Sequence, residues 1–407
     1  MPSICFYFQV HQPNRLRNYN FFDIGDSDDY FDTARNVEIL NKVAEKCYLP
    51  ANETFYNLIK KYDGEFKIAL SLSGVLLEQL ENWRPDVLYS FRKLVDTGCV
   101  ELLAETYYHS LSSVYAPKEF EAQVAKHERM IRRLFGVSPQ VFRNTELIYN
   151  NELSKTIHDF GFNGIIAEGV AAMMTAHSSN FVHHPPGLYD FPVLLKNYKL
   201  SDDIAFRFSN MEWSEYPLTA DKFSHWIHQF AGNGETINLF MDYETFGEHQ
   251  WETTGIFNFL NYLPQHVLSH PDFTFSTPSE VIEKYPIRGA YDVPKISSWA
   301  DTERDLSAWA GNPMQKEALR RFYDLETPIK NSGDWELLEN WRKLSTSDHF
   351  YYMCTKGNSD GEVHEYFSPY KSPIEAYNFF INILTDLEYR VSKVRKPILG
   401  AKESFLV

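Results

Sequence analysis

Residues 237–248 read INLFMDYETFGE and residues 140–147 read QVFRNTEL, and in both segments a short apolar run leads directly to acidic residues. Such runs indicate buried strands, after which Asp242 and Glu146 follow at once. A carboxylate at the C-terminal end of a strand lies at the mouth of a parallel α/β sheet or barrel, where these folds build their active sites. Cleavage of a glycosidic bond needs two such carboxylates, one as nucleophile or base and one as proton donor.

Outward from these segments, short apolar runs alternate with segments of helical periodicity through about residue 285. Several runs are apolar throughout, as expected for strands that are covered on both faces. About seven strand–helix units favour an incomplete parallel (β/α)7 barrel over an open sheet. The predicted strands are 4–10, 66–70, 99–103, 140–143, 164–167, 203–208, 236–241 and 273–276. The predicted helices between them include 33–47, 52–62, 84–96, 117–135 and 150–160.

Two segments, 168–200 and 286–315, interrupt this alternation. After the second, helical periodicity recurs over 313–325, 335–346 and 374–394. We therefore interpret residues 1–290 as a catalytic (β/α)7-type barrel. Residues 291–407 form the C-terminal helical region, which we expect to pack on the barrel and to contribute to its cleft.

Composition excludes several classes of partner. The chain has 39 Lys and Arg against 55 Asp and Glu, a net charge of −16, whereas nucleic acids and anionic membranes bind basic surfaces. The four cysteines form no Cys-x-x-Cys pair, and no run reaches the ~18 apolar residues of a membrane span. The N-terminus also lacks the basic segment of a signal peptide. We expect a cytoplasmic protein that binds neither nucleic acid nor membrane.

Further polar residues follow predicted strands. His11 directly follows the first strand and could hold a substrate hydroxyl or orient a carboxylate. Strand alternation points Glu101 and Glu105 the same way, and Glu105, which lies beyond the apolar part, is better placed to reach the rim. A salt bridge to an arginine is the alternative role for Glu105. Histidines and acids are numerous, but neither H-E-x-x-H nor H-x-H spacing occurs, so we expect no metal and no other cofactor.

In these residues the chain resembles glycoside hydrolase family 57, and within it the α-amylase-like branch. Five blocks in the family's order carry the resemblance: 11–13, 98–105, 143–146, 241–247 and 273–279. Each block is short, but five in order are specific, and the Trp-rich segment 299–312 extends the match beyond the barrel. Past about residue 320 the chain is recognised only as helical.

The resemblance implies a retaining enzyme that cleaves α-1,4-glucosidic bonds of an α-glucan or maltooligosaccharide without a metal, on a (β/α)7 barrel. The family's nucleophile falls on Glu146 and its general acid/base on Asp242. Its substrate contacts fall on His11, Glu105, Glu244, Asp305 and Trp309. Of the segment that joins barrel to helices, we expect Trp309 above all to border the cleft, the alternative being that its tryptophans are interface core.

The mechanism sets two further expectations. Asp242 must hold a proton near neutral pH, which burial and the charges of Glu146 and Glu244 would achieve by raising its pKa. Retention predicts that the carboxyl groups of Glu146 and Asp242 lie about 5 to 5.5 Å apart.

Other functions remain open on sequence alone. A 4-α-glucanotransferase or branching enzyme would use the same machinery. A metal-dependent polysaccharide deacetylase would share a related barrel but would use His and Asp as ligands. A carbohydrate-binding protein without catalysis would need no pair of carboxylates at strand ends.

Overall fold

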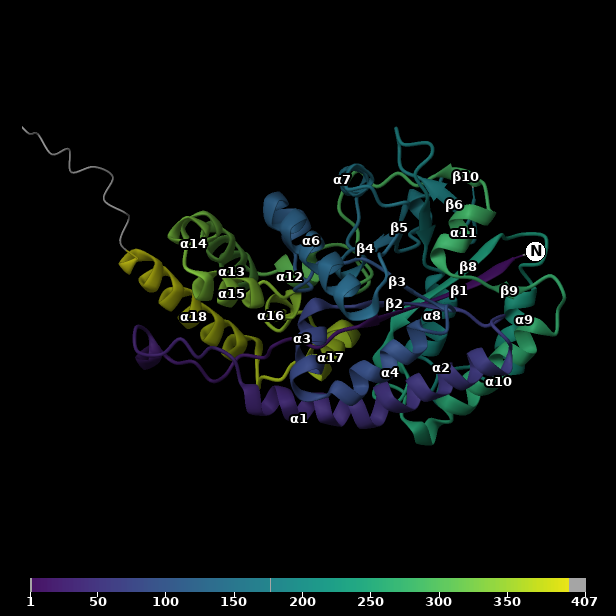
Figure 1. Cartoon of the computed structure of the whole chain (residues 1–407), viewed down its shortest axis with the longest axis horizontal. Coiled ribbons are helices and arrows are strands. Elements are labelled where there is room, and N and C mark those ends of the chain that lie inside the picture. The colour runs from purple at the N-terminus through teal and green to yellow at the C-terminus, as the bar shows by residue number, and fades with distance from the viewer. Residues whose placement is uncertain (1, 176, 395–407) are drawn as a thin grey trace, which may run out of the picture. The chain divides into compact units, whose positions relative to one another are not determined.

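The computed structural model describes residues 2–175 and 177–394, which form two compact units (Figure 1). The first unit contains residues 2–13, 34–113 and 117–306, and the second contains residues 14–33, 114–116 and 307–394. We expected a boundary at residue 290, whereas the first unit continues to Leu306 and the second takes two earlier segments. None of the helices in the described part of the chain is long and apolar enough to cross a membrane.

Seven parallel strands close into a ring in the first unit. One sheet has the order β3-β2-β1-β8 and the other contains β7-β5-β4. Single parallel bridges, Ala104 to Phe142 and Lys196 to Asn238, join the two sheets at both edges. The ring strands are β1 (Ser3–Val10), β2 (Ile68–Leu72), β3 (Val100–Leu102), β4 (Val141–Arg143), β5 (Gly164–Ala167), β7 (Val193–Leu195) and β8 (Thr236–Asp242). Outside it, β9 (Thr274–Phe275) pairs with β1, and β6 (Val182–His184) pairs with β7 and β10 (Ile287–Ala290).

Alternation along these strands stacks two layers of side chains inside the ring. The lower layer is apolar and belongs to one buried cluster: Tyr7, Ala69, Leu103, Val141, Ile166, Leu194 and Phe240. The side chains two residues further along each strand again face inward, and they form what we call the polar layer. Its members are Gln9, Ser71, Glu105, Arg143, Glu168, Lys196 and Asp242. Each ring strand therefore carries an apolar residue into the core and a polar one to the C-terminal mouth of the barrel.

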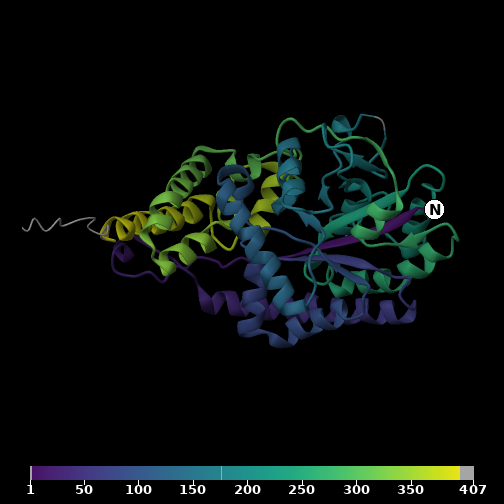
Figure 2. The same ribbon diagram turned by 45° about the horizontal axis from the view of Figure 1, so that its top comes forward.

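Helices cover the outer faces of the strands. The largest buried cluster joins the outward residues of β1, β2 and β8 to the helices on that side, and in both views α2 and α4 lie beside β1 and β2 (Figures 1 and 2). A second cluster joins β4, β5 and β7 to α6 and α7. The helices of this unit are α1 (Thr33–Val43), α2 (Leu49–Lys61), α3 (Gly74–Trp83), α4 (Pro85–Val95), α6 (Pro117–Phe135), α7 (Asn151–Asp159), α8 (Tyr198–Ala205), α9 (Ala220–His228), α10 (Ile256–Leu268) and α11 (Pro278–Lys284).

The strand predicted at 203–208 is wrong. The first half of that segment is the end of α8, which Asn197 caps by accepting a hydrogen bond from the Leu200 N–H at 3.2 Å. The ring strand that the prediction missed is β7, which has only three residues and lies inside the segment 168–200 that interrupts the sequence pattern. A strand this short gives no periodicity, so its pairing with β5 defines it.

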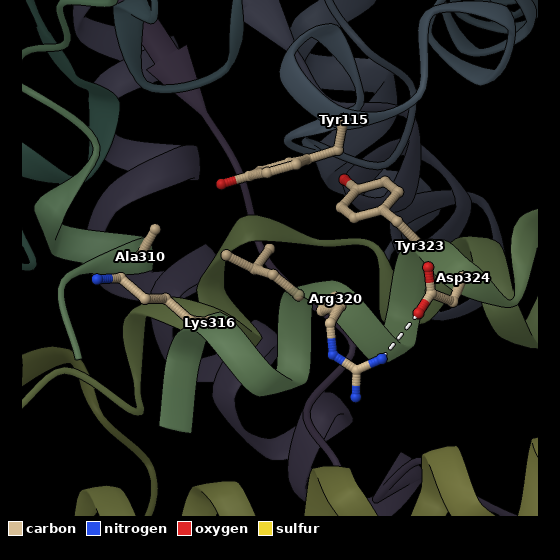
Figure 3. A pocket seen from close by; sticks show the side chains of 7 residues that line it. Tyr115, Ala310, Lys316, Arg320, Tyr323 and Asp324 are labelled. Atoms are coloured by element: carbon tan, nitrogen blue, oxygen red, sulfur yellow. Dashed lines mark hydrogen bonds and ion pairs between the residues drawn. The ribbon is translucent and has the colours of Figure 1, made fainter. Parts of the chain in front are cut away.

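The second unit is helical. Its helices are α12 (Ser307–Ala310), α13 (Pro313–Asp324), α14 (Glu326–Ser332), α15 (Trp335–Leu344), α16 (Ser347–Tyr351), α17 (Asn358–Phe367) and α18 (Pro373–Lys393), and α5 (Ser112–Tyr115) spans the boundary between the units. Three of them confirm the helices expected at 313–325, 335–346 and 374–394. Phe322 stacks on Trp341 in its core, with ring centroids 5.1 Å apart. A pocket of about 350 Å³ lies between α13 and Tyr115, whose ring stacks on Tyr323 (Figure 3).

Candidate active site

Glu146 stands in a strained turn directly after β4. It lies in the 3-10 turn Thr145–Leu147 with φ of 56° and ψ of 27°, and Leu147 also has a positive φ of 48°. Left-handed backbone is costly for residues with a side chain and persists only where the surroundings impose it, most often at functional sites. The Asn144 side chain contributes here by donating a hydrogen bond to the Ile148 carbonyl at 3.0 Å.

Both carboxylate oxygens of Glu146 accept a hydrogen bond. His109 Nε2 lies 2.8 Å from Oε1, and Trp299 Nε1 donates to Oε2 over 2.7 Å. Burial alone would raise the pKa of Glu146, but the His109 bond and charge, together with Arg143, lower it. Glu146 is therefore an ionised carboxylate held in one orientation.

Glu105, which lies deeper in the barrel, helps to keep His109 protonated. Its side chain is 0% exposed, and its carboxylate accepts Ser71 Oγ at 2.7 Å and Gln9 Nε2 at 3.2 Å, so it ties β1, β2 and the segment after β3 together. His109 Nδ1 lies 3.1 Å from Glu105 Oε2. Burial would raise the pKa of Glu105 and lower that of His109. Their mutual contact, together with Arg143 and His127 near Glu105 and with Glu146 at His109, outweighs burial and gives about 2 for Glu105 and about 9 for His109. His109 is thus an imidazolium that donates to both glutamates.

This places Glu105 differently from the substrate contact that we expected. It lies beneath His109, among the buried groups of the polar layer, and acts on the mouth of the barrel through His109. No role was assigned to His109 from the sequence. Its backbone φ of 52° turns the ring back toward Glu146, and strand alternation does not predict that turn.

Asp242 ends β8 in the same polar layer and behaves in the opposite way. Burial and the charge of Glu146 raise its pKa to about 6, against the lowering effect of Arg143 and other cations. Glu244, two residues further on, is held by the Tyr48 hydroxyl, and burial with the charge of Asp242 raises its pKa to about 8. The pKa of Asp242 is therefore raised while that of Glu146 is lowered, and the catalytic roles expected for the two residues stay predictions.

His11 lies beside His109 at the end of β1. Its Nδ1 is 2.7 Å from the Ser73 hydroxyl, and the two imidazole rings stack with centroids 4.1 Å apart. His11 is partly exposed, whereas His109 is buried. The structure therefore brings His11, Glu105, Glu146, Asp242 and Glu244 to one end of the barrel.

Four charged residues that the sequence analysis did not single out complete this end. Lys196 follows β7 and lies 3.6 Å from Glu168 and 3.1 Å from Asp202, while Arg304 lies 2.7 Å from Glu168. Glu168 is buried after β5, and burial raises its pKa against these two cations. The available signal was positional, since Glu168 and Lys196 each follow an apolar run, but the second run was not recognised as a strand.

Asp305 and Trp309 fall into different units. Asp305 is exposed near the end of the first unit, and its carbonyl accepts the Ser298 hydroxyl at 2.7 Å. Trp309 begins the second unit, is 1% exposed and packs near Tyr351 with ring centroids 6.2 Å apart. Their contacts with substrate stay predictions. The residue of this segment that does contact Glu146 is Trp299.

The residues that the structure describes include no group of three or more His, Cys, Asp or Glu side chains that could hold a metal ion. The two histidines nearest the carboxylates are occupied otherwise, since His109 bonds Glu105 and Glu146 and His11 bonds Ser73.

Comparison with known proteins gives this geometry a family. The glycosyl hydrolase family 57 model matches residues 5–294, which include all of the ring of strands except the first two residues of β1. The chain belongs to this family. A Methanocaldococcus jannaschii protein named "Putative alpha-amylase" is 44% identical over 404 residues, covering 96% of this chain and 85% of that protein. The alpha-amylase of Pyrococcus furiosus is 23% identical over 370 residues, and this chain spans about half of its length, 50%.

Solved structures agree on the fold. The family 57 branching enzyme of Pyrococcus horikoshii superposes with a TM-score of 0.68 at 13% identity, covering 96% of this chain and 94% of the other. The expected (β/α)7 barrel with a helical C-terminal region is confirmed, and the protein is a family 57 glycoside hydrolase related to alpha-amylases.

Proposed function

We propose that this protein hydrolyses α-1,4-glucosidic bonds of α-glucans or maltooligosaccharides with retention of configuration. The observation that carries the proposal is that the pKa values of two carboxyl groups are shifted in opposite directions: the pKa of Glu146 is lowered, and that of Asp242 is raised to about 6. Retaining cleavage needs this combination, because one carboxylate must attack while the other still carries a proton. The family membership and the alpha-amylase relatives supply the substrate class.

In the first step, a Glu146 oxygen attacks the anomeric carbon while Asp242 gives its proton to the departing glycosidic oxygen. The bond between that carbon and the leaving oxygen breaks, and a glucosyl ester on Glu146 forms. His109 and Trp299 each use one lone pair of the Glu146 carboxylate, and each oxygen retains another for the attack.

In the second step, Asp242, now ionised, removes a proton from water, which attacks the same carbon and releases Glu146. Asp242 returns to its protonated form, so the cycle closes without a cofactor. Two inversions at one carbon give an α-configured product from an α-configured substrate.

The substrate-binding roles of His11 and Glu244 extend this proposal, because both lie at the same end of the barrel as the carboxylates. The proposal also includes substrate contacts of Asp305 and Trp309. Trp309→Ala tests that role when substrate affinity and thermal stability are measured separately. Weaker binding would support a cleft residue, whereas loss of stability alone would assign Trp309 to the core.

Incubation with a maltooligosaccharide series tests the function itself. Shorter sugars whose new reducing ends first appear as the α anomer by proton NMR are the expected products. A β anomer first would overturn retention. Longer sugars that appear alongside the shorter ones would instead favour glucanosyl transfer, the activity implied by the name of the branching enzyme that shares the fold.

A further inference from the structure

Trp299 contacts the Glu146 residue at two points. Its backbone N–H donates to the Glu146 carbonyl over 3.1 Å, and its indole N–H donates to Oε2 over 2.7 Å. Just before it, Ser297 and Tyr149 exchange two backbone hydrogen bonds of 2.9 Å in an antiparallel bridge. The segment after the barrel thus runs against the turn that follows β4 and fixes the residue whose backbone is left-handed.

Two cations approach the indole ring of Trp299. The Arg143 guanidinium lies 5.1 Å from the ring centroid, and Lys196 Nζ lies 5.3 Å from it. Arg143 is 0% exposed, and within the described part of the chain none of its three guanidinium nitrogens has a hydrogen-bond partner. A buried guanidinium without hydrogen bonds requires an explanation, and the electron-rich face of an aromatic ring is one stabilising environment for it.

We propose that Trp299 is a positioning residue for the reaction assigned to Glu146, on which the proposal rests. Its indole, held by Arg143 and Lys196, points the N–H at Oε2 and, with His109 at Oε1, keeps the carboxylate ionised and in one orientation. The cations over the ring withdraw electron density from it, which strengthens the N–H as a donor. Arg143 thus acts on Glu146 both by its charge and through the ring.

A purely structural role for Trp299 is the competing explanation, because its ring also packs against the apolar layer of the barrel. A phenylalanine would preserve most of that packing and the aromatic face but has no N–H. Trp299→Phe therefore isolates the hydrogen bond. Trp226→Phe is the matched control, since Trp226 is also partly buried, has Lys222 5.9 Å from its ring centroid and lies on α9 outside the barrel.

The first experiment does not depend on activity. The chain has eight tryptophans, and indole N–H resonances in a nitrogen–proton NMR spectrum at about pH 6 are assigned by their loss in each Phe variant. In Glu146→Gln, the Trp299 resonance shifts because its acceptor is no longer a carboxylate, and the Trp226 resonance does not. An unmoved Trp299 resonance overturns the proposal. Should Trp299→Phe not fold, the one resonance that moves in Glu146→Gln identifies the contact instead.

The second experiment measures kcat, KM and the pH profile on a maltooligosaccharide. In Trp299→Phe we expect kcat to fall about 10- to 100-fold with little change in KM, because a charge-assisted hydrogen bond to the nucleophile is lost. The acid limb of kcat/KM should move to higher pH, because the lost Trp299 hydrogen bond lowers the pKa of Glu146 in the wild type. The other charged groups around Glu146, namely His109, Arg143, Glu105 and Asp242, are unchanged in the variant. An unchanged limb in a folded variant overturns the proposal.

The two experiments separate this proposal from the function on which it rests. A wild-type protein that cleaves no α-glucan would refute the function, while the NMR result would still decide whether Trp299 holds the Glu146 carboxylate.

Discussion

Two sides of the barrel mouth shift the pKa values of their carboxyl groups in opposite directions. Next to β3 and β4, the pKa of Glu105 is lowered to about 2 and that of Glu146 is also lowered. At the ends of β5 and β8, the pKa of Glu168 is raised and that of Asp242 is raised to about 6. All four carboxyl groups lie at the same end of one barrel, with Glu105 and Glu168 buried and Glu146 and Asp242 partly exposed. Burial raises the pKa in every case, so the difference comes from how each group meets a cation.

On the first side, the His109 imidazolium lies between the carboxylates of Glu105 and Glu146 and bonds both, at 3.1 and 2.8 Å. Its positive charge therefore acts on both at hydrogen-bond distance. On the second side, Lys196 and Arg304 are engaged with Glu168 and Asp202. No side chain among the described residues donates a hydrogen bond to Asp242, which therefore keeps the effect of its burial. Opposite settings within one ring are what a nucleophile and a proton donor need.

The largest expected effect separates these two carboxyl groups kinetically. Glu146→Gln should lower kcat by on the order of 10⁴-fold or more, because an amide cannot attack, while oligosaccharide binding persists. Asp242→Asn should lose as much on a natural glucan but recover on an aryl glycoside whose leaving group needs no proton. Steady-state kinetics on both substrates decide the roles. Equal recovery by both variants, or near wild-type activity of Glu146→Gln, would contradict the assignment.

Sequence alone could locate this pair because strand-end position is a local property. Glu146 and Asp242 follow apolar runs directly, and periodicity of two also placed Glu105 on the inner side of its strand. The role of Glu105 depends on its contact with His109, whose positive φ turns the ring back over the barrel. No sequence pattern predicts that turn. Trp299 reaches Glu146 from 153 residues away in the chain. Long-range contacts of that kind carry no periodicity.

The second effect concerns stability. Glu105→Gln should lower the free energy of unfolding by about 1.5 to 3 kcal/mol, because it removes one of the two charged partners of the buried His109 and leaves only Glu146. The folded pKa of Glu105 is depressed from 4.5 to about 2, so its contribution is present above pH 4.5 and lost as pH falls through 2. The folded pKa of His109 is raised from 6.5 to about 9, so its contribution is full below pH 6.5 and lost as pH rises through 9. The deficit of the variant should therefore be largest between pH 4.5 and 6.5.

Urea denaturation across this pH range measures the deficit. Glu101→Gln is the matched control, since Glu101 lies on the same strand, also faces inward, and has its pKa raised by burial. Its two carboxylate oxygens accept one hydrogen bond each from the Ser279 N–H and hydroxyl, and a glutamine can replace both by accepting from the N–H and donating to the hydroxyl. A deficit of equal size in both variants would show that burial, and not the pairing with His109, determines the stability.

A third effect has the opposite sign. The folded pKa of Asp242 is raised from 3.8 to about 6, so the ionised form is disfavoured in the folded state above pH 6. Asp242→Asn should therefore stabilise the protein by about 1 to 2 kcal/mol at pH 7.5, a value kept below the full shift because Asp242 is partly exposed. Near pH 4 the gain should vanish. Denaturation at the two pH values, with the exposed Asp272→Asn as control, tests this; equal gains at both would exclude ionisation as the cause.

The smallest effect tests how far Lys196, which is paired with Glu168 and Asp202, still lowers the pKa of Asp242. The wild-type kcat/KM should fall as pH rises through about 6, because the proposed mechanism requires protonated Asp242. Lys196 lowers that pKa, but it does so less than Arg143 or His109. Removing its charge in Lys196→Met should therefore raise the pKa of Asp242 and move the basic limb upward by about half a pH unit. Lys222→Met removes a partly exposed cation on α9 that is paired with Glu215, and it should leave the limb in place because solvent screens that charge. A downward shift in Lys196→Met would mean that Lys196 holds Asp242 mainly through the arrangement of Glu168 and Trp299. The contrast between the two sides of the polar layer would then be one of geometry more than of charge.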